Sequence, residues 1–95
     1  MANWLIERKL RKVSARLRAL DSELAILEPQ YLQQSQEAQD ARLEALVADT
    51  SGSERSERLA VRHAEVTNRR RQAVSQEIAD FEALKDDLLD RLTRP

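Results

Sequence analysis

Apolar residues recur at alternating steps of three and four in the first third of the chain. The pattern begins at the polar Asn3 and continues at Ile6, Leu10, Val13, Leu17, Leu20, Leu24, Leu27 and Tyr31. Such an a/d heptad repeat places one stripe of side chains along a helix and is typical of coiled coils. The pattern predicts a long helix that begins near residue 3 and packs along this stripe, the seam, against another helix.

The pattern changes after about four heptads. A strict continuation meets Gln34, Ala38 and Ala41, whereas large apolar residues reappear at Leu43 and Leu46. We interpret this as an extra four-residue step within residues 35–39. Such a stutter would locally unwind a supercoil.

Pro29 lies inside the same repeat. Proline removes one backbone hydrogen bond and clashes with the preceding helical turn. No Gly, Asn or Asp stands beside it to build a reversal. We therefore expect a kink at Pro29, and the alternative is a break that divides the chain into three helices.

The stretch Ala48–Glu57, ADTSGSERSE, carries clear turn signals. Gly52 favours the left-handed conformation that ends helices, and Ser53 is a good N-cap. We expect the first helix at about 3–49, the turn at about 50–53 and the second helix at about 53–92.

The apolar pattern of the second helix is regular only in its later part. The positions there are Val74, Ile78, Phe81, Leu84 or Lys85, Leu88 and Leu92. In the earlier part, following the large residues places Leu59, His63, Val66 and Arg70 on the seam. This assignment requires a one-step slip of register between Arg70 and Ile78.

Composition favours long helices over a thick globular core. The 95 residues include one Gly, two Pro and no Cys, and 35% are charged, which is typical of coiled coils. The lack of Cys excludes disulfides and thiolate metal sites. No apolar stretch approaches the roughly 18 residues of a membrane span. Charges begin at Glu7, where a signal peptide would have its apolar core, so we expect a cytoplasmic protein.

Charge alternates in blocks. Residues 1–20 and 51–71 are net basic, whereas residues 21–50 and 72–95 are net acidic. Folding the chain at Gly52 places each basic block beside an acidic one, whereas parallel self-pairing would place like charges together. The predicted fold is an all-α, antiparallel two-helix coiled-coil hairpin that forms a single domain over residues 1–95. We expect two copies to pair into a four-helix bundle.

The three consecutive arginines of the stretch NRRRQAV raise the question of nucleic-acid binding. Arg69 is spaced to pair with Glu65. A nucleic-acid site needs a continuous basic face, often with aromatic side chains. Because acidic residues of the first helix are expected opposite the arginines, we predict no nucleic-acid site.

Polar residues are also expected on the seam, namely Gln34, His63 and Arg70. Such a polar layer costs stability and fixes the register of the helices. A hinge or a partner-docking zone is the alternative. His63 is the only histidine and has no companions at ligand spacing, so we expect neither a metal ion nor a cofactor. No catalytic constellation is apparent, and we predict a non-enzymatic protein.

The predicted turn is acidic, because Asp49, Glu54 and Glu57 surround it. This arrangement resembles the acidic-tipped coiled-coil hairpins of bacterial RNA polymerase secondary-channel regulators, whose tip carboxylates reach the metal of the active site. The resemblance covers architecture alone, since the globular docking domain of those regulators has no counterpart here. It implies, as one alternative, a regulator that inserts its tip into a larger machine.

The N-terminal stretch Trp4–Leu20 is basic and amphipathic. Its apolar stripe should pack on the second helix from Leu10 onward, and an anionic membrane surface is the alternative partner. Trp4, Leu5 and Ile6 should project past the end of the second helix near Pro95. Such an exposed apolar cluster needs a partner.

These patterns predict a coiled-coil adaptor that binds a protein partner, or a second copy of itself, through its helical faces and open end. The predicted interface at the open end comprises Trp4, Leu5, Ile6, Leu84, Leu88 and Leu89. We expect a homodimer in which Trp4 is buried, since Trp is a frequent anchor of interfaces.

Overall fold

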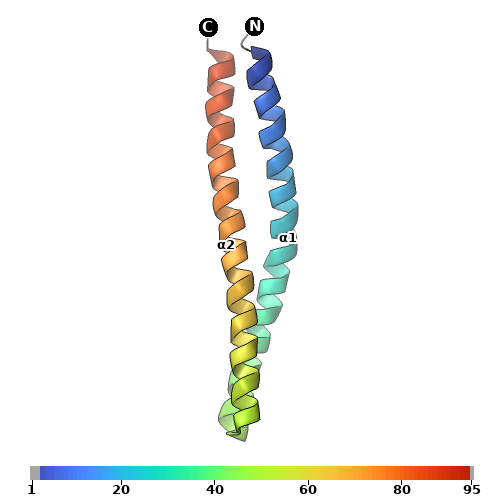
Figure 1. The fold of residues 1–95 in the computed structure, drawn as a ribbon, viewed down its shortest axis with the longest axis vertical. Coiled ribbons are helices and arrows are strands. Elements are labelled where there is room, and N and C mark those ends of the chain that lie inside the picture. Colours follow the sequence, from blue (N-terminus) through green and yellow to red (C-terminus); the bar gives the residue numbers. More distant parts are fainter. Residues whose placement is uncertain (1–2, 95) are drawn as a thin grey trace. The chain divides into compact units, whose positions relative to one another are not determined.

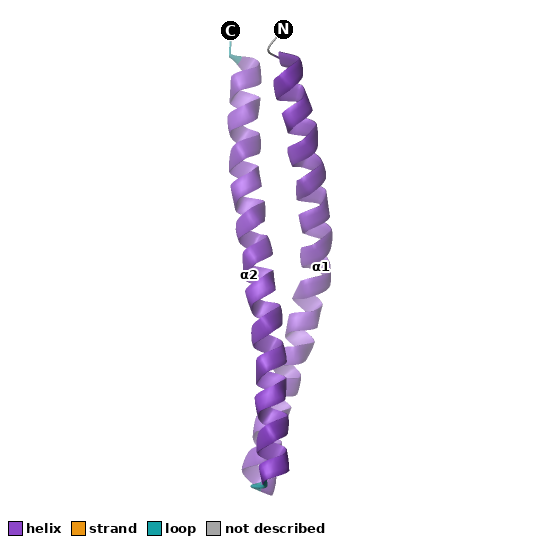
Figure 2. Cartoon of the chain, viewed as in Figure 1, coloured by secondary structure: helices purple, strands orange, loops and turns teal. Residues whose placement is uncertain are grey.

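The chain folds into two long α-helices that pack against each other (Figures 1 and 2). In the computed structural model, which describes residues 3–94, α1 spans Asn3–Ala48 and α2 spans Ser51–Thr93. The predicted all-α helical hairpin is confirmed. The end of the chain at Pro95, near which the open end was placed, lies outside the described residues.

The two helices contribute to two compact units. The terminal unit comprises Met1–Leu24 and Ala73–Pro95, and the turn unit comprises Ala25–Gln72. Each unit contains one segment of α1 and one of α2, and each has its own packing.

The terminal unit has an aliphatic core. Its buried cluster is formed by Ile6, Val13, Leu17 and Leu88, with Leu10, Ile78, Phe81 and Leu92 packed against it. Leu20 and Val74 are also fully buried. Burying a Leu, Ile or Val side chain contributes roughly 1.5–3 kcal/mol, so this core is the main source of stability in the unit.

The seam of the turn unit consists of small and polar residues. The seam positions, all buried or half-buried, are Leu27, Tyr31, Gln34, Ala38, Ala41 and Ala45 of α1 and Glu57, Ala60, Ala64, Thr67 and Arg71 of α2. They follow steps of three and four on both helices without interruption. Ala45, Ala64 and Thr67 are the buried members of this seam.

The predicted stutter in the first helix and register slip in the second are therefore wrong. Leu43 and Leu46 are exposed, and so are Leu59 and Val66, although their size assigned them to the seam. A regular helix keeps the same stripe of positions against its neighbour, and a shift would require local unwinding. The alanines at the strict heptad positions remove any need for such a shift.

The turn between the helices is shorter than predicted and uses other residues. Asp49, not Gly52, has a positive φ of 49°, and its N–H still donates to the Ala45 carbonyl at 3.0 Å. Thr50 is the N-cap of α2, because its Oγ1 accepts from the Ser53 N–H at 3.1 Å, while the Thr50 N–H donates to Ser53 Oγ at 3.2 Å. Gly52 lies inside the first turn of α2, so its predicted left-handed role and the predicted Ser53 cap are wrong.

Pro29 lies inside α1, which continues through it. The alternative of three separate helices is therefore wrong, whereas the kink stays a prediction. Proline lacks an N–H, so the carbonyl of Ala25 has no partner at the usual position four residues later.

Ion pairs between the helices follow the predicted antiparallel order. In the turn unit, Arg42 pairs with Glu57 at 3.6 Å and Arg71 with Glu28 at 3.3 Å. In the terminal unit, Arg16 pairs with Glu77 at 3.0 Å. Each pair is partly exposed and contributes only about 0.2–1 kcal/mol, so the pairs set alignment more than stability.

Candidate protein-interaction surfaces

The terminal unit exposes large apolar side chains outside its core. Trp4 is 56% exposed, and Leu5, Leu84 and Leu89 are also exposed. These four residues of the predicted interface are available to a partner.

The other two residues of the predicted open-end interface are not available. Ile6 and Leu88 belong to the buried cluster of the terminal unit. The prediction placed Ile6 beyond the end of the second helix, but Ile6 lies in one buried cluster with Leu88, and Leu92 packs against that cluster. Their assignment to a partner interface is therefore corrected.

The apolar stripe of the basic N-terminal segment is used inside the terminal unit. Ile6, Val13, Leu17 and Leu20 are buried. A membrane surface would therefore meet only Trp4 and Leu5 from this segment in the folded chain. Neither helix, over the described residues, combines the length and hydropathy required to cross a bilayer.

Arg71 is the arginine that lies on the seam of the turn unit. Its Nη2 and Nε donate to Asn68 Oδ1 at 2.8 and 3.2 Å, and its Nη1 donates to Glu28 Oε1 at 3.3 Å. Its guanidinium also lies 4.7 Å from the centre of the Tyr31 ring. These contacts hold the Arg71 side chain between the helices with only 28% of it exposed.

Arg70 is exposed, so its predicted place on the seam is wrong. The steps of three and four through Thr67, Arg71 and Val74 bypass it by one residue. Arg69 is the partner of Glu65, as its spacing predicted, at a long 3.9 Å. The neighbouring arginines therefore have different environments, which a count of positive charges does not reveal.

A shallow groove lies on one side of the turn unit. It is lined by Gln34, Leu59, Arg62, His63, Val66 and Thr67. Gln34 is on the seam as predicted, and its Oε1 is buried without a hydrogen-bond donor. His63 is exposed rather than part of a seam layer, because the seam position beside it is Ala64.

The acidic residues at the turn line one shallow depression together with Arg42. Asp49, Glu54 and Glu57 are all at its border, so the structure brings them together as predicted. However, Glu57 forms an ion pair with Arg42, and its side chain is only 29% exposed. This pairing leaves Asp49 and Glu54 as the carboxylates nearest the turn without an ion pair among residues 3–94.

Sequence reasoning missed Arg71 as a seam residue. The signal was present, because steps of three and four counted backwards from Val74 reach Arg71, Thr67 and Ala64. The prediction followed the size of the residues instead of their spacing, and it therefore did not place Arg71 on the seam. No three His, Asp or Glu side chains gather as a metal-ion site in the part of the chain that the structure describes.

Comparisons with family models, with curated proteins and with solved structures found no match to this chain. The function proposed below is therefore argued from the surfaces of the molecule.

Proposed function

We propose that this protein is a non-enzymatic coiled-coil interaction protein whose terminal unit binds a protein partner through Trp4 and Leu5. The supporting observation is the exposure of these adjacent residues at the start of α1, outside an otherwise well-packed core. Leu84 and Leu89 of α2 extend the apolar surface available in the same unit.

Trp4 is suited to anchor such a contact. Tryptophan combines a large apolar area with a polar N–H and few rotatable bonds, and it is enriched among residues that dominate binding energy. The flanking segment is basic, with Arg8, Lys9 and Arg11 exposed. An acidic helix or loop with an apolar pocket is the partner chemistry that complements this surface.

The test is affinity purification of the tagged full chain from a lysate of its native host. A partner should be retained by the wild type and lost by Trp4→Ala/Leu5→Ala. The matched control is Leu43→Ala/Leu46→Ala, which removes similarly exposed apolar side chains from the turn unit and should retain the partner.

Two further measurements separate the alternatives. Flotation of the chain with anionic vesicles, lost in the Trp4 variant, would assign this surface to a membrane instead. A shift of Trp4 fluorescence to shorter wavelength on raising the concentration of the pure protein would show that the partner is a second copy. A protein that retains the same partners in both variants contradicts the proposal.

A further inference from the structure

The outer face of α2 in the turn unit carries a second heptad stripe. It consists of Arg55, Leu59, Arg62, Val66 and Arg69, separated by steps of four and three and all exposed. Helical residues at this spacing lie along one face, so the stripe alternates positive charge with aliphatic side chains. A helix face that contacts only water would gain no stability from the two aliphatic side chains at these positions.

The α1 segment of the turn unit carries a matching stripe of opposite charge. It consists of Gln33, Glu37, Asp40, Glu44 and Val47, with the same steps of four and three, and all are exposed. Val47 is 87% exposed. The two outer stripes are therefore of equal length, one basic and one acidic.

Most charged side chains of the two stripes have no ion-pair partner among residues 3–94. Among residues 3–94, neither Arg55 nor Arg62 forms an ion pair, and the same holds for Asp40 and Glu44. Glu37 accepts one hydrogen bond, from Gln33 at 3.1 Å. The charges are therefore free to meet another molecule.

The internal ion pairs define which charges lie at the same level along the turn unit. From the Arg42–Glu57 pair, two residues toward the turn on each helix lead to Glu44 and Arg55. Five residues away from the turn lead to Glu37 and Arg62. Glu28 and Arg71 pair two heptads from Arg42–Glu57 on both helices, so this alignment holds through the unit.

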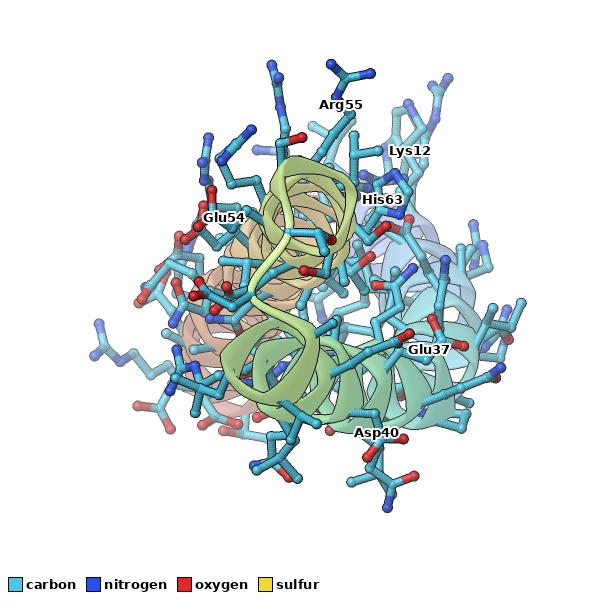
Figure 3. The ribbon with its side chains drawn as sticks, turned by 90° about the horizontal axis from the view of Figure 1, so that it is seen from below. Lys12, Glu37, Asp40, Glu54, Arg55 and His63 are labelled. Atoms are coloured by element: carbon cyan, nitrogen blue, oxygen red, sulfur yellow. The ribbon has the colours of Figure 1, made fainter. Side chains whose placement is uncertain are left out.

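Parts of both stripes face the same side. Leu59, Arg62 and Val66 line the groove together with His63 and Gln34. Figure 3 shows His63 and Glu37 on this side of the turn unit, Arg55 directed away from α1, and Asp40 directed away from α2. The groove is thus lined by Arg62 of α2 and Gln34 of α1, and Glu37 of α1 lies on the same side in Figure 3.

We propose that this side of the turn unit binds a second copy of the chain, related by a two-fold axis parallel to the helices. That axis places α2 of each copy, antiparallel, beside α1 of the other and keeps the levels matched. Arg55 then meets Glu44 of the second copy, and Arg62 meets Glu37. Leu59 and Val66 of both copies are covered in the resulting four-helix arrangement.

The charges select this axis over its alternative. A two-fold axis perpendicular to the helices, in the plane of the contact, would place α2 on α2 and α1 on α1. Stripes of the same charge would then face each other, and like charges directly opposite each other destabilise a contact. A nucleic acid would meet the arginines but also the carboxylates at the same levels. The proposal rests on the proposed interaction role but uses a surface that Trp4→Ala/Leu5→Ala leaves intact, so the two tests fail separately.

The test is a charge exchange followed by sedimentation equilibrium, against a monomer mass of 10.9 kDa. The wild type should dimerise at micromolar concentration and more weakly at high salt. Arg55→Glu/Arg62→Glu makes both stripes acidic, and Glu37→Arg/Glu44→Arg makes both basic. Each variant alone should dimerise at least about 100-fold more weakly, because every interfacial pair then has like charges.

The mixture of the two variants is the decisive measurement. In the mixed pair every contact is again attractive, so an equimolar mixture should restore the dimer. Lys12→Glu/Arg18→Glu changes the net charge equally, but these exposed residues lie in the terminal unit. This control should dimerise like the wild type and should not replace the acidic variant in the mixture.

Three outcomes would overturn the proposal. They are a wild type that remains monomeric, a mixture that fails to associate while both variants keep their helical circular dichroism, and a control that behaves like the acidic variant. A monomeric wild type that shifts a short DNA or RNA duplex, with the shift lost in Arg55→Glu/Arg62→Glu, would assign the basic stripe to nucleic acid.

Discussion

The two units of the chain use one heptad repeat with different contents. In the terminal unit the seam holds large residues such as Leu20, Val74 and Leu88, and these are fully buried. In the turn unit the same positions hold Ala45, Ala64 and Thr67, which are also buried. Position in the repeat, and not residue size, therefore decides which side chains enter the seam.

This difference has a cost and a consequence. Alanines and polar residues bury little apolar area, so the turn unit gains less from the hydrophobic effect than the terminal unit. The large residues of the turn unit, among them Leu32, Leu43 and Leu46, are left on its outside. Both units thus expose large apolar side chains, but the terminal unit also buries a cluster of them in its core.

Two neighbouring residues in the terminal unit provide the strongest test of how burial on the seam contributes to stability. Leu88 is 1% exposed and Leu89 is 41% exposed. Leu88→Ala should lower the free energy of unfolding by about 2–5 kcal/mol, because it removes buried area and leaves a cavity. Leu89→Ala should change it by only about 0.5 kcal/mol. Urea denaturation followed by circular dichroism measures both, and equal losses would contradict the assigned core.

In the turn unit, the equivalent pair of neighbours has its small residue buried and its large residue exposed. Ala45 is buried, whereas Leu46 is 74% exposed. Ala45→Leu should destabilise the protein by about 1–3 kcal/mol, because it adds methylenes at a seam position that is already buried. Leu46→Ala should be nearly neutral. If the stutter existed, Leu46→Ala would instead be the damaging change in the same denaturation experiment.

The sequence predicted the terminal unit better than the turn unit for a physical reason. Where large apolar residues occupy every seam position, as from Ile6 to Leu20, size and spacing agree. Where alanine occupies the seam, the largest residues lie outside, and following them shifts the register by one step. A small residue signals burial only through its place in a repeat, and a polar residue such as Arg71 only through its partners.

Arg71 and Arg70 test the polar part of the turn unit. Arg71→Ala should cost about 1 kcal/mol, since it removes a cation–π contact and a partly exposed ion pair. The exposed Arg70→Ala change should cost less than about 0.5 kcal/mol. A larger loss for Arg70 than for Arg71, measured by thermal unfolding of both variants, would restore the original seam assignment.

The smallest expected effect is at Gly52, and its sign is the informative quantity. Gly52 lies in the first turn of α2 without a positive φ, and a Cβ there would meet nothing nearer than Thr50 Oγ1 at 4.0 Å. Gly52→Ala should therefore stabilise the protein by about 0.4–1 kcal/mol, because the unfolded chain loses conformational freedom while the fold loses no contact.

Had Gly52 ended the first helix in the left-handed conformation, the added Cβ would destabilise the turn instead. Thr50→Ala is the matched control, because it deletes the cap that accepts from the Ser53 N–H and should cost about 0.5–2 kcal/mol. Both shifts are measurable as opposite changes in melting temperature. A fall in melting temperature for both variants would mean that the residue with the left-handed backbone is Gly52 and not Asp49.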